Sequence, residues 1–220
     1  MDWIRLCNIE YFYHYKLLTI DQYKTITAPS EGYYKAKGSK FTGFAIPIFS
    51  EEEFKEHLAR IKKEHPHSGH YCYGFRIGAD NKLYRYSDDG EPSSTAGKPI
   101  FGQIQSYDLT NIMIVVIRYF GGTKLGVGGL ITAYRAAAKE ALENAKIVNR
   151  TVDNIYRLKF GYDIMSDVMN FIKKNDLKVT SQILEESGTI QFRVRQSEAE
   201  NLIEQLEKVE GLKVSFLKTI

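Results

Sequence analysis

Ile112-Met-Ile-Val-Val-Ile-Arg-Tyr-Phe-Gly-Gly-Thr-Lys-Leu-Gly-Val-Gly-Gly-Leu130 joins an apolar run to a loop that contains five glycines. Residues 111–119 predict a central strand, because they are apolar on both faces. Residues 130–145 predict a helix that packs closely on a sheet, because alanine recurs along the apolar side. Chains build such a strand, loop and helix where backbone comes close to a neighbour or a ligand.

Periodic patterns predict further elements on the N-terminal side of this unit. They are a strand at 41–49, an amphipathic helix from Ser50 to His65, a strand at 71–77, its hairpin return at 83–86 and a short helix at 100–107. Ser50 followed by Glu53 is a capping-box pattern, which marks the start of the first helix. Residues 23–150 are therefore expected to form one domain of strands and helices.

Six elements follow a boundary at residues 149–151. They are a strand at 155–162, a helix at 166–174, strands at 178–184 and 189–195, a helix at 197–209 and a strand at 213–217. This β-α-β-β-α-β order is the ferredoxin-like arrangement. The sequence thus predicts an α+β protein with two domains, 23–150 and 151–220. Residues 1–22 are an extension to which no role is assigned.

Charge and composition limit the classes of partner. The net charge is +3 and the pI about 8.6, which permits a polyanionic partner without requiring one. Residues 23–150 hold 18 Lys and Arg against 13 Asp and Glu, whereas residues 151–220 hold 10 against 11. A nucleic-acid face is therefore expected on the first domain. Two cysteines suggest a reduced, cytoplasmic setting, and no apolar run of about 20 residues predicts a membrane span.

The glycine-rich loop is a candidate anion site. Gly126, Gly128 and Gly129 would let backbone amides approach an anion at the start of a helix. Lys124 would add a point charge and Arg118 a two-pronged donor. The plainer alternative is that the glycines serve only tight turns and helix packing. The dinucleotide fingerprint is excluded, since its third glycine is missing at the required spacing.

A second polar loop spans residues 87–99. Its carboxylates are Asp88, Asp89 and Glu91, and its hydroxyls are Ser93, Ser94 and Thr95. Together these oxygens could bind Mg²⁺, or Lys98 and the small residues could hold phosphate. The alternative is a structured turn in which Asp and Ser side chains bond the loop backbone. The loop is not a P-loop, because Pro99 replaces the required hydroxyl residue.

Histidines and a cysteine cluster just before this loop. His65, His67, His70 and Cys72 offer nitrogen and sulfur ligands, but their spacing matches no recurrent zinc pattern. No metal site is therefore assigned. Cys72 is expected to be a small buried residue and His70 a hydrogen-bonded group near the loop. A nucleophilic role for this pair lacks an orienting third group, so no catalytic residue is assigned.

Aromatic residues alternate with arginines along several predicted strands. They are Tyr71, Tyr73, Phe75, Tyr84, Tyr86, Tyr119 and Phe120, with Arg76, Arg85 and Arg118 between or beside them. Such residues can stack on exposed bases. Core and cross-strand packing is the alternative use of the same side chains.

Three blocks taken together resemble the IMPACT/YigZ family. They are His70-Tyr-Cys72, the stretch from Ser87 to Pro99, and the stretch from Arg118 to Leu130 with Ala133-Tyr134. The resemblance covers about residues 23–147, and residues 151–220 resemble the second domain of the bacterial members. It implies a ribosomal protein S5 domain 2-like fold followed by a ferredoxin-like domain, a pair similar to two consecutive domains of elongation factor G. Ser94 departs from the family pattern, in which glycine is common.

The resemblance implies a link to translation, since eukaryotic relatives regulate translation by binding a partner of a stress-responsive kinase. We therefore expect a cytoplasmic RNA- or ribosome-binding protein, with a protein partner as a further option and no cofactor. The predicted binding residues are Arg118, Lys124, Gly126, Gly128, Gly129 and Lys98, with the 87–99 loop beside them and His70, Cys72, Tyr119 and Tyr134 in support. The alternative is an enzyme acting on a phosphorylated small molecule at the glycine-rich loop.

Overall fold

A computed structural model describes residues 21–220, which divide into two compact units. The larger unit is Tyr23–Arg150, and the smaller is Thr151–Ile220 together with Asp21 and Gln22. Both combine sheets with helices, so the protein is of mixed α and β class, as predicted. The predicted extension lies outside the described residues, apart from its last two. Within residues 21–220, every helix is too short or too polar to cross a membrane.

The larger unit contains a five-stranded antiparallel sheet with the order β2-β3-β6-β4-β5. The strands are β2 (Ser30–Ala36), β3 (Ser39–Pro47), β4 (His70–Ile77), β5 (Leu83–Ser87) and β6 (Ile112–Tyr119). β6 is the central strand, and residues 112–118 are all buried. This burial on both faces explains why its sequence does not alternate between apolar and polar residues.

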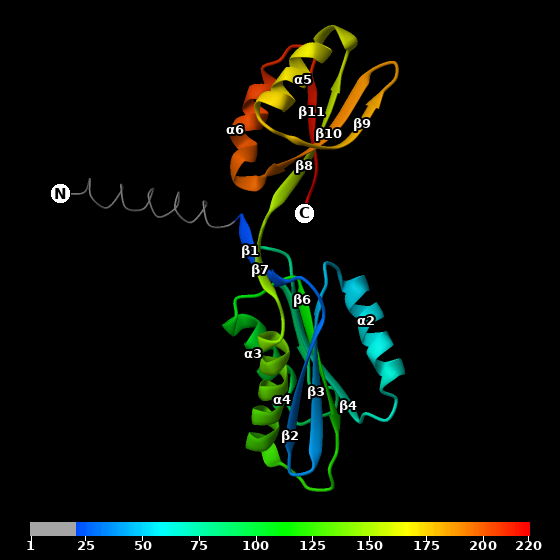
Figure 1. Ribbon diagram of the computed structural model, residues 1–220, viewed down its shortest axis with the longest axis vertical. Coiled ribbons are helices and arrows are strands. Elements are labelled where there is room, and N and C mark those ends of the chain that lie inside the picture. Colours follow the sequence, from blue (N-terminus) through cyan, green and yellow to red (C-terminus); the bar gives the residue numbers. More distant parts are fainter. Residues whose placement is uncertain (1–20) are drawn as a thin grey trace, which may run out of the picture. The chain divides into compact units, whose positions relative to one another are not determined.

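Helices cover both faces of this sheet (Figure 1). On one face lies α2 (Glu51–Glu64), whose Phe54 and Ile61 pack into a core with Met113, Val115 and Ile117 of β6. On the other lie α3 (Gly97–Ser106) and α4 (Gly126–Glu143), whose core includes Ile112, Ile114 and Val116. Alternate side chains of β6 thus serve two separate cores.

α4 packs against β2 and β3 at very short range, as its alanines predicted. Ala137 and Ala141 are fully buried on the helix side. On the strand side, a Cβ added at Gly32 would lie 2.2 Å from the Ala141 nitrogen, and one at Gly43 would lie 2.6 Å from the Ala137 oxygen. Only glycine on the strands admits the helix backbone this closely.

A separate two-stranded sheet pairs β1 (Gln22–Ile26) with β7 (Ile147–Thr151). These segments stand at the start and the end of the larger unit in the sequence. Thr110 also donates its backbone N–H to the Lys24 carbonyl oxygen, at 2.9 Å. The strand β1 is therefore fastened to the loop that precedes β6.

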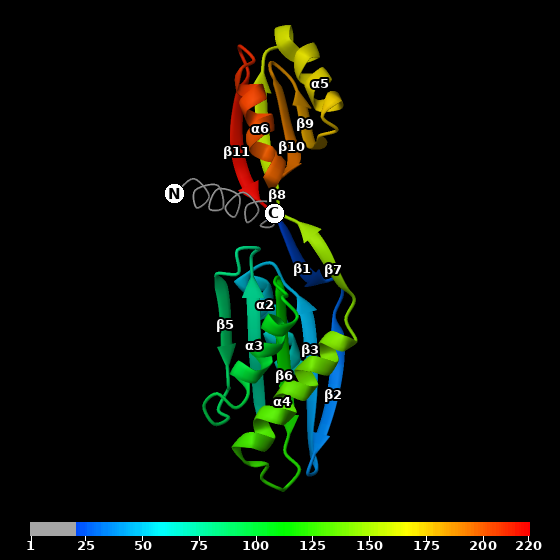
Figure 2. The ribbon, with the colours of Figure 1, turned by 90° about the vertical axis from the view of Figure 1, so that its left-hand side faces the viewer.

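The smaller unit has the predicted β-α-β-β-α-β order. Its elements are β8 (Asp153–Phe160), a 3-10 turn η1 (Tyr162–Ile164), α5 (Met165–Lys174), β9 (Lys178–Leu184), β10 (Gly188–Arg195), α6 (Gln196–Glu207) and β11 (Lys213–Thr219). The strands form an antiparallel sheet in the order β11-β8-β10-β9. Figure 2 shows α5 and α6 on the same face of this sheet.

Candidate functional site

The three sequence blocks converge at one end of the central strand β6. Arg118, near the end of β6, pairs with His70 at the start of β4. The loop between β5 and α3 contacts both strands, and α4 begins a few residues beyond the end of β6. Strand pairing and these contacts bring together segments that are up to 64 residues apart in the sequence, from His70 to Tyr134.

A buried ion pair joins the loop to the strand. Arg118 Nη1 lies 2.7 Å from Glu91 Oε1, and the two side chains are only 9% and 4% exposed. The Tyr134 hydroxyl, from α4, donates to the same Glu91 oxygen at 2.8 Å. Arg118 Nε has no hydrogen-bond partner among residues 21–220. Glu91 thus links the loop, β6 and α4 through one carboxylate.

This arrangement corrects the prediction that Arg118 faces a phosphate. The sequence places the arginine beside a glycine-rich loop, but its guanidinium is turned into the core and neutralised by Glu91. Glu91 likewise leaves the proposed set of solvent-facing oxygen ligands. Both charges lie in the protein interior. Removing one partner of such a pair leaves the other charge buried and unpaired, which lowers the free energy of unfolding.

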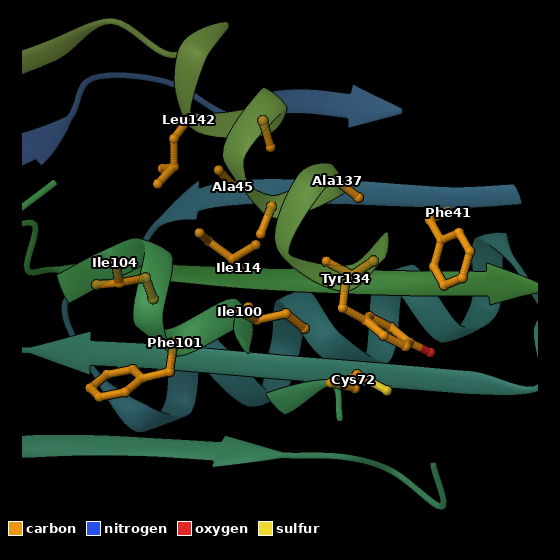
Figure 3. Packing of buried hydrophobic residues seen from close by; sticks show 14 of the residues in the cluster. Phe41, Ala45, Cys72, Ile100, Phe101, Ile104, Ile114, Tyr134, Ala137 and Leu142 are labelled. Atoms are coloured by element: carbon orange, nitrogen blue, oxygen red, sulfur yellow. The ribbon is translucent and has the colours of Figure 1, made fainter. Parts of the chain in front are cut away.

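Cys72 and Tyr134 lie together on the inner side of this network. The Tyr134 ring packs edge-on against Phe41 at 5.1 Å, and its hydroxyl and the Cys72 sulfur point toward the same end of the sheet (Figure 3). Cys72 Sγ donates to the Asp88 carbonyl oxygen at 3.0 Å. Burial raises the pKa of Cys72 to about 12, and burial also raises the pKa of Tyr134. Cys72 is therefore a protonated, buried thiol at neutral pH, not an activated nucleophile.

Asp88 and Asp89 organise the loop backbone. Asp88 accepts hydrogen bonds from the backbone N–H groups of Ser94, Ala96 and Gly97 at 2.8–2.9 Å, which caps the start of α3. Asp89 accepts from the Tyr71 N–H at 2.7 Å, and His70 Nδ1 donates to the Asp89 carbonyl oxygen at 2.8 Å. The structured-turn interpretation of this loop thus accounts for both carboxylates.

The hydroxyl residues of the loop have different positions. Thr95 is buried, and its hydroxyl donates to the Pro92 carbonyl oxygen at 2.6 Å. Ser93 and Ser94 are exposed, and Ser94 has a φ of 62°. This left-handed backbone conformation favours glycine, which is a physical reason for the glycine that is common at this position in the family pattern. Lys98 is exposed in the first turn of α3.

His65 and Cys72 are divided between the two cores of the larger unit. His65 Nδ1 and the Tyr119 hydroxyl share a hydrogen bond of 3.0 Å beside the core beneath α2. Cys72 lies in the opposite core, beneath α3 and α4. Residues 21–220 contain no group of three or more His, Cys, Asp or Glu side chains arranged to hold a metal. Tyr119 likewise stands apart from Arg118, because neighbouring residues of a strand point to opposite faces.

The glycines of the loop have three different structural roles. Gly121 is required for packing, since an added Cβ would lie 1.9 Å from the backbone of Gly38. Gly122 and Gly126 have φ values of 84° and 74°, which other residues rarely adopt. Gly129 is confined by the Leu125 side chain at 3.0 Å. Gly128 has neither constraint, because its φ is ordinary and an added Cβ would meet nothing within 4 Å.

The start of α4 is open to solvent. The helix has no side-chain cap at Leu125 and no acidic residue in its first turn, so its first backbone N–H groups are free of a capping carboxylate. Lys124 is exposed immediately before it. Phe120 and Val127 are 61% and 59% exposed, and the Arg118 guanidinium lies 5.4 Å from the Phe120 ring centre. A positive, partly apolar surface therefore surrounds the helix start.

Two serines that sequence reasoning missed hold the site in place. Ser68 donates its hydroxyl to the Arg118 carbonyl oxygen at 3.2 Å, and Ser39 accepts from the Gly121 N–H at 3.2 Å. Neither belongs to a recognisable motif, and Ser39 is 82 residues from its partner. No pattern in the sequence distinguishes them from other serines of the chain.

The aromatic residues divide between the core and the surface. Phe75 is fully buried, and Tyr73 stacks on it with ring centres 6.4 Å apart. Tyr84 and Tyr86 of β5 are exposed, but each stacks on Phe101 of α3. Packing accounts for these four rings, and Phe120 is the exposed aromatic beside the candidate site.

Comparison with known proteins places these features in a wider group. Residues 37–142 match the family model of the Impact N-terminal domain. The chain is 32% identical to the IMPACT family member YvyE of Bacillus subtilis over 71% of this chain and 72% of that protein. It is also 32% identical to the IMPACT family member YigZ of Escherichia coli, over 69% of this chain and 76% of that protein. A solved structure described only as that of a hypothetical protein is similar with a TM-score of 0.69 and 25% identity, over 90% of this chain and 98% of that one.

Proposed function

The chain belongs to the IMPACT family, and we propose that it is a translation-linked protein that binds RNA or the ribosome at the start of α4. The same proposal assigns residues 23–150 to the S5 domain 2-like fold and residues 151–220 to the ferredoxin-like fold. The strand order β11-β8-β10-β9 with both helices on one face supports the second assignment. The family resemblance supports the link to translation.

Gly128 is the observation that carries the proposal. A glycine inside a helix lowers stability by about 1 kcal/mol relative to alanine. Packing and backbone conformation explain the other loop glycines, but Gly128 has open space around it and an ordinary φ. Gly102 of α3 has similar space inside a helix, but Gly128 lies in an uncapped first turn next to the exposed Lys124, where an external anion can approach the backbone.

The chemistry of the helix start favours a phosphate. Uncapped N–H groups and the partial positive charge of the helix end attract anions. Lys124 supplies a full positive charge next to them, and Lys98 is an exposed cation in the first turn of α3. Phe120 offers an exposed ring on which a base can stack. Arg118 does not touch the ligand in this proposal. Its ion pair with Glu91 holds the 87–99 loop against β6.

A matched pair of glycine substitutions tests this proposal. Gly102 of α3 also has nothing within 4 Å of an added Cβ, so Gly102→Leu and Gly128→Leu make comparable changes on two helices. Gly128→Leu is expected to weaken binding to purified ribosomes or to a 20-nucleotide RNA by about tenfold, which is roughly 1.4 kcal/mol. Gly102→Leu should leave affinity unchanged. Equal effects of the two variants, or no binding by the wild type, would refute the proposal.

The charge contribution is tested by salt dependence. Lys124→Ala should weaken binding to all RNA sequences alike and reduce the salt slope by about one. Thermal stabilisation by ATP with Mg²⁺ or by a phosphorylated metabolite, lost in Gly128→Leu, would instead favour the enzyme alternative. A ligand at 100 times its dissociation constant adds about 2.7 kcal/mol of stability, which is easily measured.

A further inference from the structure

The sheet of the smaller unit has helices on one face only. Leu158, Phe160, Ile190 and Phe192 point toward α5 and α6 and form the core with them. Because side chains alternate along a strand, their neighbours in β8 and β10 point to the opposite face. Within the described residues of this unit, no helix or strand packs on that opposite face, which is called the open face below.

The open face is strongly basic. Seven cations lie on it in register: Arg157 and Lys159 on β8, Lys178 on β9, Arg193 and Arg195 on β10, and Lys213 and Lys218 on β11. All except Arg195 are exposed. Arg193 and Arg195 form ion pairs with Asp153 and Asp21, while the other five have no ion-pair partner among residues 21–220.

The amino-acid composition of the smaller unit does not indicate that this face is basic. Residues 151–220 hold 10 Lys and Arg against 11 Asp and Glu. However, Asp153 is the only acidic residue in the four strands, and the others lie on helices and turns. These others are Asp163, Asp167, Asp176, Glu185, Glu186, Glu198, Glu200, Glu204, Glu207 and Glu210. The fold thus separates a nearly neutral segment into a basic sheet face and acidic surroundings.

Two pairs of like charges face each other directly across strands. Lys213 is opposite Lys159, and Arg193 is opposite Lys178. Like charges in such positions destabilise a sheet. Nothing in the unit itself offsets the first pair, since neither lysine has an acidic partner among the described residues. An anionic ligand on the open face would remove this repulsion.

The geometry of the face suits a phosphate backbone. Arg157 and Lys159 are two residues apart on one strand, which spaces their side chains by about 7 Å, comparable with successive phosphates of a nucleic acid. Uncharged donors lie between the cations, among them Gln191 and Ser215. The aromatic residues of the four strands all lie on the helix-covered face: Tyr156, Phe160, Phe192 and Phe216. The strands therefore offer no aromatic ring on the open face on which a base could stack.

We propose that the open face of β11-β8-β10-β9 binds the sugar-phosphate backbone of RNA without regard to its sequence. This surface is separate from the start of α4 and does not depend on it. The cations supply the attraction to phosphates, and binding releases counterions, so affinity falls as salt rises. The absence of aromatic side chains on this face predicts equal affinity for uridine-rich and mixed sequences.

The test compares two double variants of the full-length chain that change the charge equally. Lys159→Gln with Lys213→Gln removes two positive charges from the open face, whereas Lys173→Gln with Lys174→Gln removes two from the last turn of α5. The probe is a fluorescein-labelled 20-nucleotide RNA, titrated at several salt concentrations. Loss of two phosphate contacts should lower the salt slope by about 1.4 and the affinity by about 25-fold at about 0.1 M salt. The α5 variant should bind like the wild type.

Further outcomes each decide the question. Equal losses in both double variants, or no loss in either, would overturn the proposal. Binding to vesicles that contain anionic lipid, without binding to RNA, would assign the face to a membrane instead. Circular dichroism melting must first establish that both variants fold. If Lys124→Ala has no effect while the open-face variant loses affinity, the α4 proposal fails and this one stands.

Discussion

The two sheets of this molecule differ in how many of their faces are covered. The sheet of the larger unit lies between α2 and the pair α3 and α4, so both faces are core. The sheet of the smaller unit is covered by α5 and α6 alone, and charged side chains occupy its other face. The first sheet can offer a site only at its ends, whereas the second can offer a whole face.

The difference also changes what a charged residue does. Arg118 on the covered sheet is enclosed with Glu91 and holds three elements together. Arg157 and Lys159 on the other sheet are exposed and have no ion-pair partner in the described part of the chain. A similar residue type is thus structural in one unit and available to a ligand in the other.

The largest predicted effect comes from breaking the enclosed pair. Glu91→Ala leaves Arg118 charged and buried without a partner, which should lower the free energy of unfolding by about 3 to 5 kcal/mol. The control is Glu51→Ala, which removes the partner of Arg85 in a pair that is 54% and 29% exposed and should lose less than about 1 kcal/mol. Urea denaturation measures both. Similar losses would mean that burial does not separate the two pairs.

The second prediction concerns the buried thiol in the same covered core. Burial raises the pKa of Cys72 to about 12, above the value of about 8.5 in an unfolded chain. The thiol is protonated in both states below that lower value, so its contribution to stability is fully present there. Between the two values only the unfolded thiol ionises, and stability should fall by about 1.4 kcal/mol for each pH unit.

Comparison with Cys72→Ala isolates this effect from other titrating groups. The quantity to compare is the slope of unfolding free energy against pH, not its absolute value, because the substitution also leaves a small cavity. Parallel slopes for the two proteins above pH 9 would contradict the assignment of Cys72 as a thiol that stays protonated.

The smallest predicted effect belongs to the open face. Lys213→Glu replaces a like-charge pair with Lys159 by an opposite-charge pair, which should raise stability by about 0.2 to 1 kcal/mol. The same change should weaken RNA binding, so stability and affinity move in opposite directions. Thermal melting at low salt measures the first quantity. A loss of stability would show that the two side chains do not repel each other in the sheet.

Most of the helices and strands could be predicted from the sequence, because the periodicity of apolar residues indicates each element. The apolar run of 112–117 predicted a central strand, and the β-α-β-β-α-β order was predicted for the second unit. Helix α3 was expected to begin at Ile100 but begins at Gly97. The reason is Asp88, which caps the helix from nine residues upstream of Gly97 and so lies outside any local pattern.

The sites were predicted less well, because their properties depend on contacts between distant residues. The sequence indicated that Arg118 and Glu91 were important, but not that they neutralise each other. The net charge of the smaller unit is near zero, so its composition does not indicate a basic face. Strand register, not composition, determines that its cations share one face.

The close approach of α4 to β2 and β3 has a consequence for binding. Gly32 and Gly43 bring the backbone of the second half of α4, at Ala137 to Ala141, into direct contact with the strands, which restricts sliding and tilting of the helix. The same restriction limits how far its first turn can move when a ligand arrives. A ligand that fits this turn loses little affinity to ordering the protein, and poorly shaped ligands are rejected because the surface cannot adapt to them.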